Sequence, residues 1–453
     1  MDDISLFFWL TEFICLVTLY YFNRRLLSLL SVSLMTAPYL FFSYAYFVVA
    51  PAFNVAFDTY IDRSLFHGDP VWALALLNIV NSIGLLCAYF GVAFADQGPS
   101  GGSSAAVNGR MLIAINLILL PVSIFYGIYF LYLSGGLYQD ASGKLVVEGS
   151  IFNFILIGTA PILFCWTTAT YFVLSRKRPP HLLALLIILV HLILVLSMNS
   201  ARGSRVSMLI QLILAAQIYG LSILRFRFLH YAAAAIFLAL FLPTYAYYKY
   251  AGFDAFYDYV TGRGPSEVAA HYNDPVTFVV GDIGRADIQA PILMGVLDGI
   301  VTPNYFGESY VAGALLILPT SLRPNWAKQK ISLGEEAQFK LSGRYNASSQ
   351  VNNGQFASSR IYGLLGEALL NFGIFAVPAA FFLFGFLSRR CFLRVSPPNS
   401  WGRVLTAPFF ALFPVYMLFY DFDNIVFQTI VVWSLPALLL LLCMISAKKA
   451  GHI

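Results

Sequence analysis

A series of long apolar runs limits what this chain can fold into, because each run is long enough to cross a lipid bilayer. A helix needs about 20 apolar residues to cross a hydrocarbon core of about 30 Å. We count about eleven such runs, and a count of ten or twelve also fits the sequence. They cover residues 4–22, 26–52, 70–95, 111–133, 151–174, 182–198, 208–223, 231–249, 362–386, 405–420 and 425–446. The sequence therefore predicts an all-α polytopic membrane protein.

The composition agrees with a protein surrounded by membrane lipids. Of the 453 residues, 59% are hydrophobic and only 11% are charged, against roughly 25% charged residues in a soluble domain. The net charge of +5 does not indicate a nucleic-acid partner, because the basic residues are spread over short loops and form no patch with interleaved aromatic residues. The five cysteines and the histidines show no metal-binding spacing.

Basic residues in alternate loops predict the orientation, since Lys and Arg near span ends are retained in the cytoplasm. One set of loops holds fourteen of the 27 basic residues, with Asp96 as its only acid. These basic residues are Arg24, Arg25, Arg110, Arg176, Lys177, Arg178, Arg225, Arg227, Arg389, Arg390, Arg394, Arg403, Lys448 and Lys449. We therefore predict that the N-terminus lies outside and the C-terminus inside.

The chain divides into three predicted parts: N-terminal spans (1–249), one long outer loop (250–361) and C-terminal spans (362–453). The loop is the longest stretch that is not dominated by apolar residues. Two apolar pieces within it, Ile288–Val301 and Tyr310–Pro319, are too short to cross and indicate re-entrant or interfacial segments. We therefore expect the loop to fold over the helix bundle as a lid.

Two arginines in a short outer turn, Arg202 and Arg205, run against the predicted charge distribution. A guanidinium group matches phosphate oxygens through two parallel hydrogen bonds, so the pair suits a phosphate or pyrophosphate. The structural alternative is contact with the head groups of outer-leaflet lipids.

Three residues are candidates for a general base. His271 and Asp282 lie with Arg285 in a glycine-containing part of the outer loop, which is also compatible with an ordinary solvated loop. Glu367 lies inside an expected span, where an ionisable group is a functional candidate. Arg360, two helical turns earlier, is also positioned to form a structural ion pair with Glu367.

Other polar residues within the spans fit structural roles. Glu12 lies in the first span without a nearby partner in sequence, and we expect it to be structural. Interhelical hydrogen bonds are the simplest interpretation of the remainder, namely Asn78, Asn81, Asn116, His191 and Gln211.

Several short motifs resemble the bacterial Wzy-type polymerases of oligosaccharide repeat units, the O-antigen polymerase family. The motifs are Ala201-Arg-Gly-Ser-Arg205, Gly284-Arg-Ala-Asp-Ile288, Phe306-Gly-Glu-Ser-Tyr310, Leu318-Pro-Thr-Ser-Leu-Arg323-Pro-Asn-Trp-Ala-Lys328 and Gly366-Glu-Ala-Leu-Leu-Asn-Phe-Gly373. Arg323 and Gly334 also match the Arg-x10-Gly pattern of part of that family. The resemblance covers the second half of the chain and the topology of the whole.

The resemblance implies a membrane glycosyltransferase without metal or cofactor, in the bacterial inner membrane with its active site facing the periplasm. Its substrate is an oligosaccharide linked to undecaprenyl pyrophosphate, and a chain-length regulator protein is a possible partner. Outer arginines would hold the pyrophosphate, and we assign this role to Arg202, Arg205, Arg285, Arg323 and Arg360. We rank Asp282 first as the base, then His271 and Glu367.

Two alternative functions stay open. An O-antigen ligase has the same topology but transfers a finished glycan to another acceptor. A flippase or other transporter of lipid-linked sugars belongs to a different class, and internal repeats and charges near the bilayer midplane would be typical of it.

Overall fold

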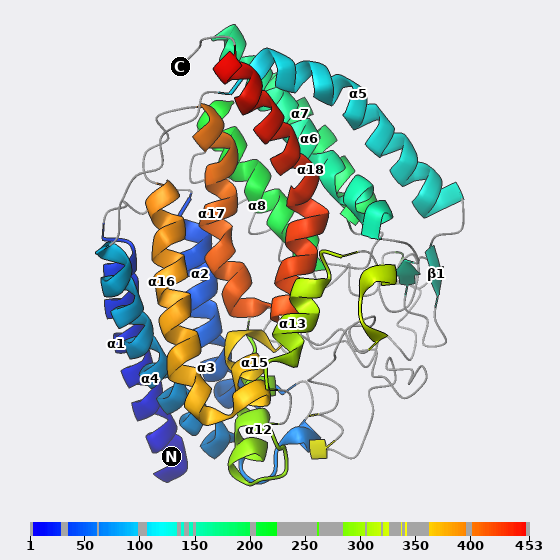
Figure 1. Ribbon diagram of the computed structural model, residues 1–453. Helices are drawn as coiled ribbons and strands as arrows, with labels where there is room; N and C mark the ends of the chain where they lie inside the picture. Colours follow the sequence, from blue (N-terminus) through cyan, green and yellow to red (C-terminus); the bar gives the residue numbers. More distant parts are fainter. Residues whose placement is uncertain are drawn as a thin grey trace. The chain divides into compact units, whose positions relative to one another are not determined.

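The computed structural model describes two compact units of a largely helical chain (Figure 1). Unit 1 comprises Met1–Gly101, Asp274–Ser396 and Phe410–Phe427, and unit 2 comprises Gly102–Asn273, Pro397–Phe409 and Gln428–Ile453. The described residues are 3–28, 35–60, 63–97, 107–133, 137–139, 145–147, 151–199, 205–223, 261, 284–303, 306–318, 320–325, 337, 340–341, 362–395 and 401–449.

Long apolar helices form most of the described chain. They are α1 (Asp3–Leu26), α4 (Pro70–Asp96), α5 (Gly109–Ile128), α6 (Ile151–Ser175), α7 (His181–Asn199), α8 (Arg205–Ser222), α16 (Val377–Val395), α17 (Trp401–Phe419) and α18 (Phe422–Lys449). The shorter helices are α2 (Ala37–Tyr44), α3 (Ala50–Phe57), α12 (Ala286–Leu297), α13 (Glu308–Leu315) and α15 (Gly363–Phe372). The π-helix η1 (Ala45–Val49) joins α2 to α3, and a second one, η3 (Tyr129–Leu133), follows α5.

Within the described residues, eight helical segments are long and apolar enough to cross a membrane. They are Asp3–Leu26, Ala37–Phe57, Pro70–Asp96, Gly109–Leu131, Phe152–Ser175, His181–Met198, Ile374–Val395 and Phe422–Lys449. The prediction of a helical membrane protein with many spans is thus confirmed. The count of eleven stays a prediction, because 231–249 lies outside the described residues. Runs 208–223 and 405–420 form apolar helices whose described stretches are shorter.

The expected span 362–386 differs from the structure, because Gly373 interrupts it. Gly373 adopts a φ of 76°, a conformation that glycine reaches without a steric penalty, and its N–H closes α15 by donating to Leu369 O. The 3₁₀ turn η7 (Ile374–Ala376) and α16 then follow. Glu367 therefore lies in a short helix of 10 residues and not inside a span.

The described part of the loop 250–361 enters unit 1 more deeply than a lid would. The first expected apolar piece forms α12, which is buried along most of its length and packs against α4 and α15. The second forms α13, where a Cβ at Gly313 would press against the backbone of Asp423. A 3₁₀ turn, η5 (Thr320–Leu322), follows it. The expected helix near Trp326–Lys340 lies largely outside the described residues.

Unit 1 is built around α4, which packs between α1 and α16. Glycines permit the close approach of α4 and α16. A Cβ at Gly91 would overlap the carbonyl oxygen of Phe382, and a Cβ at Gly385 would overlap that of Ala88. Packing of this kind, with small residues at the contact, is a common way to associate helices in lipid.

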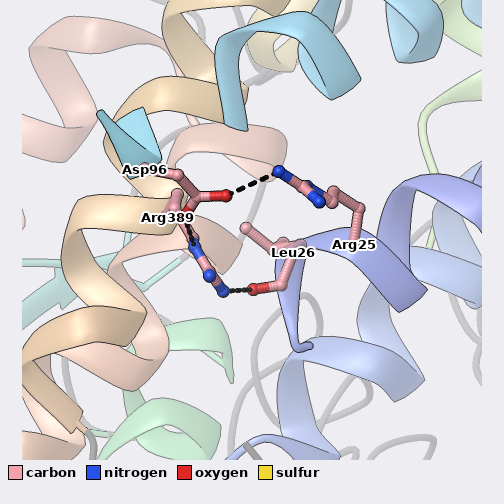
Figure 2. Close-up of polar contacts among 4 residues, drawn as sticks. All are labelled: Arg25, Leu26, Asp96 and Arg389. Carbon is pink, nitrogen blue, oxygen red and sulfur yellow. Dashed lines mark hydrogen bonds and ion pairs between the residues drawn. The ribbon is translucent and has the colours of Figure 1, made fainter. Parts of the chain in front are cut away.

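An ion cluster joins the C-terminal ends of these three helices (Figure 2). We call Arg25, Leu26, Asp96 and Arg389 the Asp96 cluster. The Asp96 carboxylate binds Arg25 Nη2 at 3.0 Å and Arg389 Nε at 2.7 Å. Arg389 Nη1 also donates to the Leu26 carbonyl at 2.7 Å. The sole acid of the predicted inner loops is thus shared by two of their arginines.

Unit 2 contains α5 to α8, with α6 packed against the other three helices. Leu131, Ile157 and Met198 form a fully buried apolar cluster within it. Gln211 donates to the Gly158 carbonyl at 2.7 Å, and the Tyr219 hydroxyl lies 3.3 Å from His191 Nδ1. These contacts match the structural roles expected for Gln211 and His191.

A small antiparallel hairpin departs from the all-helical expectation. Strand β1 (Leu137–Gln139) pairs with β2 (Leu145–Val147), with Tyr138 opposite Val146. It lies in the loop between α5 and α6, so it leaves the pattern of apolar spans unchanged.

Candidate functional site

The structure describes the side chains of three predicted site residues, Arg285, Arg323 and Glu367. Arg202, His271, Asp282 and Arg360 lie outside the described residues, and at Arg205 only the backbone at the start of α8 is described. The pairing expected between Arg360 and Glu367 therefore stays a prediction. The described candidates lie in unit 1, where α12, α13 and α15 meet the turn between α17 and α18.

Arg285 lies at the N-terminal end of α12 and is only 8% exposed. Its Nη1 donates to the Gly284 carbonyl at 2.8 Å, and the guanidinium carbon lies 5.6 Å from the centre of the Phe419 ring. The N-terminal end of a helix carries a partial positive charge, so a buried arginine there adds to the positive potential. Asp287, 3% exposed in the first turn of α12, places a buried acid at the same helix end, so this corner of unit 1 combines a cation with an acid.

Gln289, one turn along α12, connects this corner to two other elements. Its Nε2 donates to the Tyr46 hydroxyl at 2.5 Å and to the Tyr362 carbonyl at 2.6 Å. Tyr46 lies in η1, near the middle of the span Ala37–Phe57. The start of α12 consequently reaches the interior of the bundle. A single π-helical turn within an α-helical span is frequently found at functional sites.

A second set of polar residues surrounds Glu367, and we call Ser309, Glu367, Asn371 and Asp421 the Glu367 cluster. Glu367 is 4% exposed; its Oε1 accepts from the Ser309 hydroxyl at 2.8 Å and its Oε2 from the Phe422 N–H at 2.7 Å. Asn371 Nδ2 donates to Ser309 Oγ at 2.8 Å. Asn371 Oδ1 accepts from the Gly307 N–H at 3.0 Å. Glu367 thus connects α13, α15 and α18.

Asp421 belongs to the same cluster and caps α15. Its Oδ1 accepts from the N–H groups of Tyr362 and Gly363 at 2.8 and 3.1 Å. A carboxylate at this position satisfies the donors that a helix start leaves unpaired. Gly363 allows the close contact, since a Cβ there would overlap the Leu418 carbonyl.

Sequence reasoning missed several members of this cluster, although one signal was present. Asp421 and Asp423 flank Phe422 with the Asp-x-Asp spacing that in other proteins can hold a metal ion. In the structure Asp421 caps α15, and Asp423 Oδ1 accepts from the Asn424 N–H at 2.6 Å. No group of three or more His, Cys, Asp or Glu side chains in the described part of the chain is arranged to hold a metal. Ser309 and Asn371 stand in the quoted motifs, but their pairing required the fold.

The electrostatics of the Glu367 cluster combine burial with neighbouring negative charge. Burial raises the pKa of Glu367 above its ordinary value and Asp421 raises it further, while the hydrogen bonds from Ser309 and Phe422 oppose the rise. Burial also raises the pKa of Tyr310, with Glu367 and Asp421 adding to the effect. Tyr310 packs against Phe372 and Phe422. Both carboxyl groups therefore act on the Tyr310 hydroxyl.

Arg323 is anchored at the other end of α13. Its Nε donates to the Leu318 carbonyl at 2.9 Å and its Nη2 to the Leu316 carbonyl at 3.1 Å. A basic side chain at a helix C-terminus satisfies carbonyls that the helix leaves unpaired. The described contacts of Arg323 thus fit a structural role, and they do not join it to Arg285.

The site brings the buried cation of Arg285, the buried carboxyl group of Glu367 and the half-buried carboxyl group of Asp421 into one unit. Both Arg285 and Asp421 lie within electrostatic range of the Tyr46 hydroxyl. Such an arrangement can bind an anionic group at Arg285 and exchange a proton with a hydroxyl at a carboxyl group of raised pKa. Comparison of the chain with protein-family models, with curated proteins and with solved structures finds no match.

Proposed function

We propose that the chain is a membrane glycosyltransferase that polymerises lipid-linked oligosaccharide repeat units. The growing glycan is transferred from undecaprenyl pyrophosphate to a new lipid-linked unit at the periplasmic face of the bacterial inner membrane. The observation that carries the proposal is the position of Arg285, which is buried at the positive N-terminal end of α12. Both Arg285 and Asp421 lie within electrostatic range of the Tyr46 hydroxyl. The resemblance of the surrounding motifs to Wzy-type polymerases supports it.

Arg285 suits the leaving group of this reaction. Cleavage of the bond between sugar and pyrophosphate releases negative charge, and an arginine in a poorly hydrated site stabilises such charge strongly. The guanidinium group is held from one side by the Gly284 carbonyl and lies over Phe419. The planar fork of a guanidinium group has the geometry that matches phosphate oxygens.

The acceptor sugar hydroxyl needs a proton acceptor, and carboxyl groups supply one. Asp282, close to Arg285 in sequence, stays our first candidate, followed by His271 and Glu367. Glu367 and Asp421 accept hydrogen bonds from N–H groups that begin α18 and α15. We therefore assign them mainly to holding these helices around the site, with Glu367 as the base only if the ligand reaches it.

The proposed orientation follows from the two ends of α16. Arg389 near its C-terminal end belongs to the Asp96 cluster, whereas Gly373, just before its start, follows Asn371 of the Glu367 cluster. The Asp96 cluster lies among the predicted inner loops. Arg285 and the Glu367 cluster would then face the periplasm.

A polymer assay in a strain lacking this gene tests the proposal. We expect the gene to restore a ladder of polysaccharide chain lengths, Arg285→Ala to leave single repeat units, and Arg285→Lys to restore little because the paired donors are lost. The expected loss is ~2 to 4 kcal/mol of transition-state stabilisation. Arg390→Ala, which removes a contact with Phe386 on α16, is the matched control. A normal ladder from Arg285→Ala would contradict the assignment of Arg285.

A flippase is the second candidate, because the ends of α12 and α15 resemble the discontinuous helices of transporter sites. Both helices are short. Gln289 near the start of α12 donates to the Tyr362 carbonyl at the start of α15 and to Tyr46, which lies near the middle of the span Ala37–Phe57. In transporters such helix ends face the substrate. Purified protein in detergent distinguishes the two classes, since a polymerase elongates synthetic lipid-linked units there and a flippase does not. A ligase would instead transfer the glycan to a different acceptor, so transfer to that acceptor without elongation of a repeat unit would favour a ligase over both.

A further inference from the structure

The packing of α1 against α4 buries a set of polar side chains that the proposed function does not use. Glu12 on α1 is 5% exposed, and Asn78 and Asn81 on α4 are 0% and 1% exposed. Asn78 and Asn81 are separated by one helical turn, so they lie near one another on the same side of α4. These three residues all lie inside segments long and apolar enough to cross the membrane.

One oxygen atom of each of the three side chains is buried without a hydrogen-bond donor among the described residues. Asn78 Nδ2 donates to Glu12 Oε2 at 2.6 Å. Glu12 Oε1, Asn78 Oδ1 and Asn81 Oδ1 are fully buried and accept no hydrogen bond from the described residues. The neighbouring hydroxyl group of Ser82 donates to the Asn78 carbonyl of the backbone, and so does not serve these atoms.

Three buried oxygen acceptors without donors are unfavourable in a membrane helix pair. Taking a polar group out of water without a hydrogen bond is unfavourable, and an ionised carboxylate is more so unless a positive charge is nearby. No lysine or arginine of the described chain forms an ion pair with Glu12. A bound cation would compensate both the charge and the unused lone pairs.

We propose that Glu12, Asn78 and Asn81 form a binding site for Na⁺ between α1 and α4. Carboxylate and amide oxygens are the ligands that hard cations prefer. A single carboxylate with two neutral amides supplies one negative charge, which matches a monovalent ion better than Ca²⁺ or Mg²⁺. The site is independent of the proposed glycan polymerisation. It would hold α1 against α4, the helix on which α12 also packs.

Thermal unfolding of the purified full-length protein in detergent tests this site. At constant ionic strength and mildly alkaline pH, NaCl should raise the Tm of the parental protein in a saturable way, compared with choline chloride, and KCl should have a smaller effect. Glu12→Gln and Asn81→Ala should lose the response to Na⁺. Asn116→Ala, which alters an equally buried asparagine of unit 2, should keep it.

Direct measurement of Na⁺ binding to the parental protein tests the site even if a variant does not fold. Radioactive Na⁺ should bind the parental protein and be displaced by unlabelled Na⁺ but not by the same concentration of K⁺. Equal Tm values in NaCl, KCl and choline chloride, with no bound radioactive Na⁺, would overturn the proposal. If Glu12→Gln instead raised the Tm in every salt, a proton held by Glu12 would explain the buried oxygens and the Na⁺ site would be wrong.

Discussion

At one end of unit 1 a carboxylate binds two arginines, whereas near the other end two carboxyl groups accept hydrogen bonds from backbone N–H groups. Asp96 neutralises part of the charge of Arg25 and Arg389, and one of these arginines also donates to the Leu26 carbonyl. Glu367 and Asp421 hold the starts of α18 and α15. The same chemical group therefore fixes helix ends in two ways.

The difference concerns charge more than geometry. In the Asp96 cluster the Arg389 guanidinium group is already engaged by Asp96 and by the Leu26 carbonyl, so one of the two cations of the cluster is used for holding helix ends. Backbone N–H groups stabilise a carboxylate without cancelling its charge. The Glu367 cluster and the nearby cation of Arg285 consequently keep local fields inside a low-dielectric interior, which is the condition that favours chemistry.

Removal of the Asp96 carboxylate should give the largest loss of stability. Asp96→Asn leaves Arg389, whose side chain is 3% exposed, without its counter-charge. Breaking a buried pair in this way typically destabilises a protein by about 3–5 kcal/mol. The measurement is thermal unfolding of purified protein in detergent.

The exposed pair of Asp58 and Arg63 provides a matched control. Their side chains are 65% and 64% exposed and 2.8 Å apart, and such pairs contribute about 0–1 kcal/mol. Asp58→Asn should therefore leave the Tm nearly unchanged. Equal losses for the two variants would show that the Asp96 cluster does not act as a buried ion pair.

Disturbing the packing between α4 and α16 should give the second-largest loss of stability. Gly91→Ala places a methyl group against the Phe382 carbonyl, and overpacking of this kind costs about 1–3 kcal/mol. Leu86→Ala, at a position 53% exposed on the same helix, is the control and should change the Tm little. A Gly91→Ala loss as large as that of Asp96→Asn would mean that packing, and not charge, dominates this end of the unit.

Much of the fold could be predicted because apolar length alone identifies a span. Seven expected runs correspond to helices of sufficient length, and the second part of an eighth, 362–386, lies in the helical segment Ile374–Val395. The break at Gly373 was not predicted, because a single glycine within an apolar run is also compatible with a continuous helix. The deep position of α12 depends on Gln289 meeting Tyr46, a contact between residues far apart in the sequence.

Less of the candidate site could be predicted. Arg285 was identified in the polar part of the outer loop and Glu367 by its charge within an apolar run, and both are buried in unit 1. The alternative of an ion pair between Glu367 and Arg360 stays a prediction, whereas the described partners of Glu367, Ser309 and the Phe422 N–H, come from α13 and α18. Backbone donors leave no trace in sequence composition, so a capping role of this kind is visible only in three dimensions.

Loss of the Ser309 hydroxyl should lower the stability less than Asp96→Asn or Gly91→Ala. Ser309→Ala removes the donor to Glu367 Oε1 and the acceptor of Asn371 Nδ2, which typically costs about 1–2 kcal/mol. Ser321→Ala, at an exposed position, is the control. If Ser309→Ala unfolded at the parental temperature, the hydrogen bonds around Glu367 would not be holding α13 to α15.

The smallest effect we predict is a dependence of stability on pH that arises at Glu367. Burial and Asp421 raise the pKa of Glu367 in the folded protein above its value in the unfolded chain. The folded state then binds more protons than the unfolded state between the two pKa values, so stability falls as the pH rises through this window. The contribution of Glu367 is fully present below its unfolded pKa and is lost above its folded pKa.

Glu367→Gln tests this origin, because glutamine cannot ionise. The Tm of the parental protein should decline from mildly acidic to mildly alkaline pH, and Glu367→Gln should show a shallower decline, whatever its Tm at a single pH. Ser321→Ala, which changes an exposed side chain without a carboxyl group, should keep the parental slope. A parental slope in Glu367→Gln would assign the titration to another group, and the Glu367 cluster would then hold its helices through hydrogen bonds that pH does not alter.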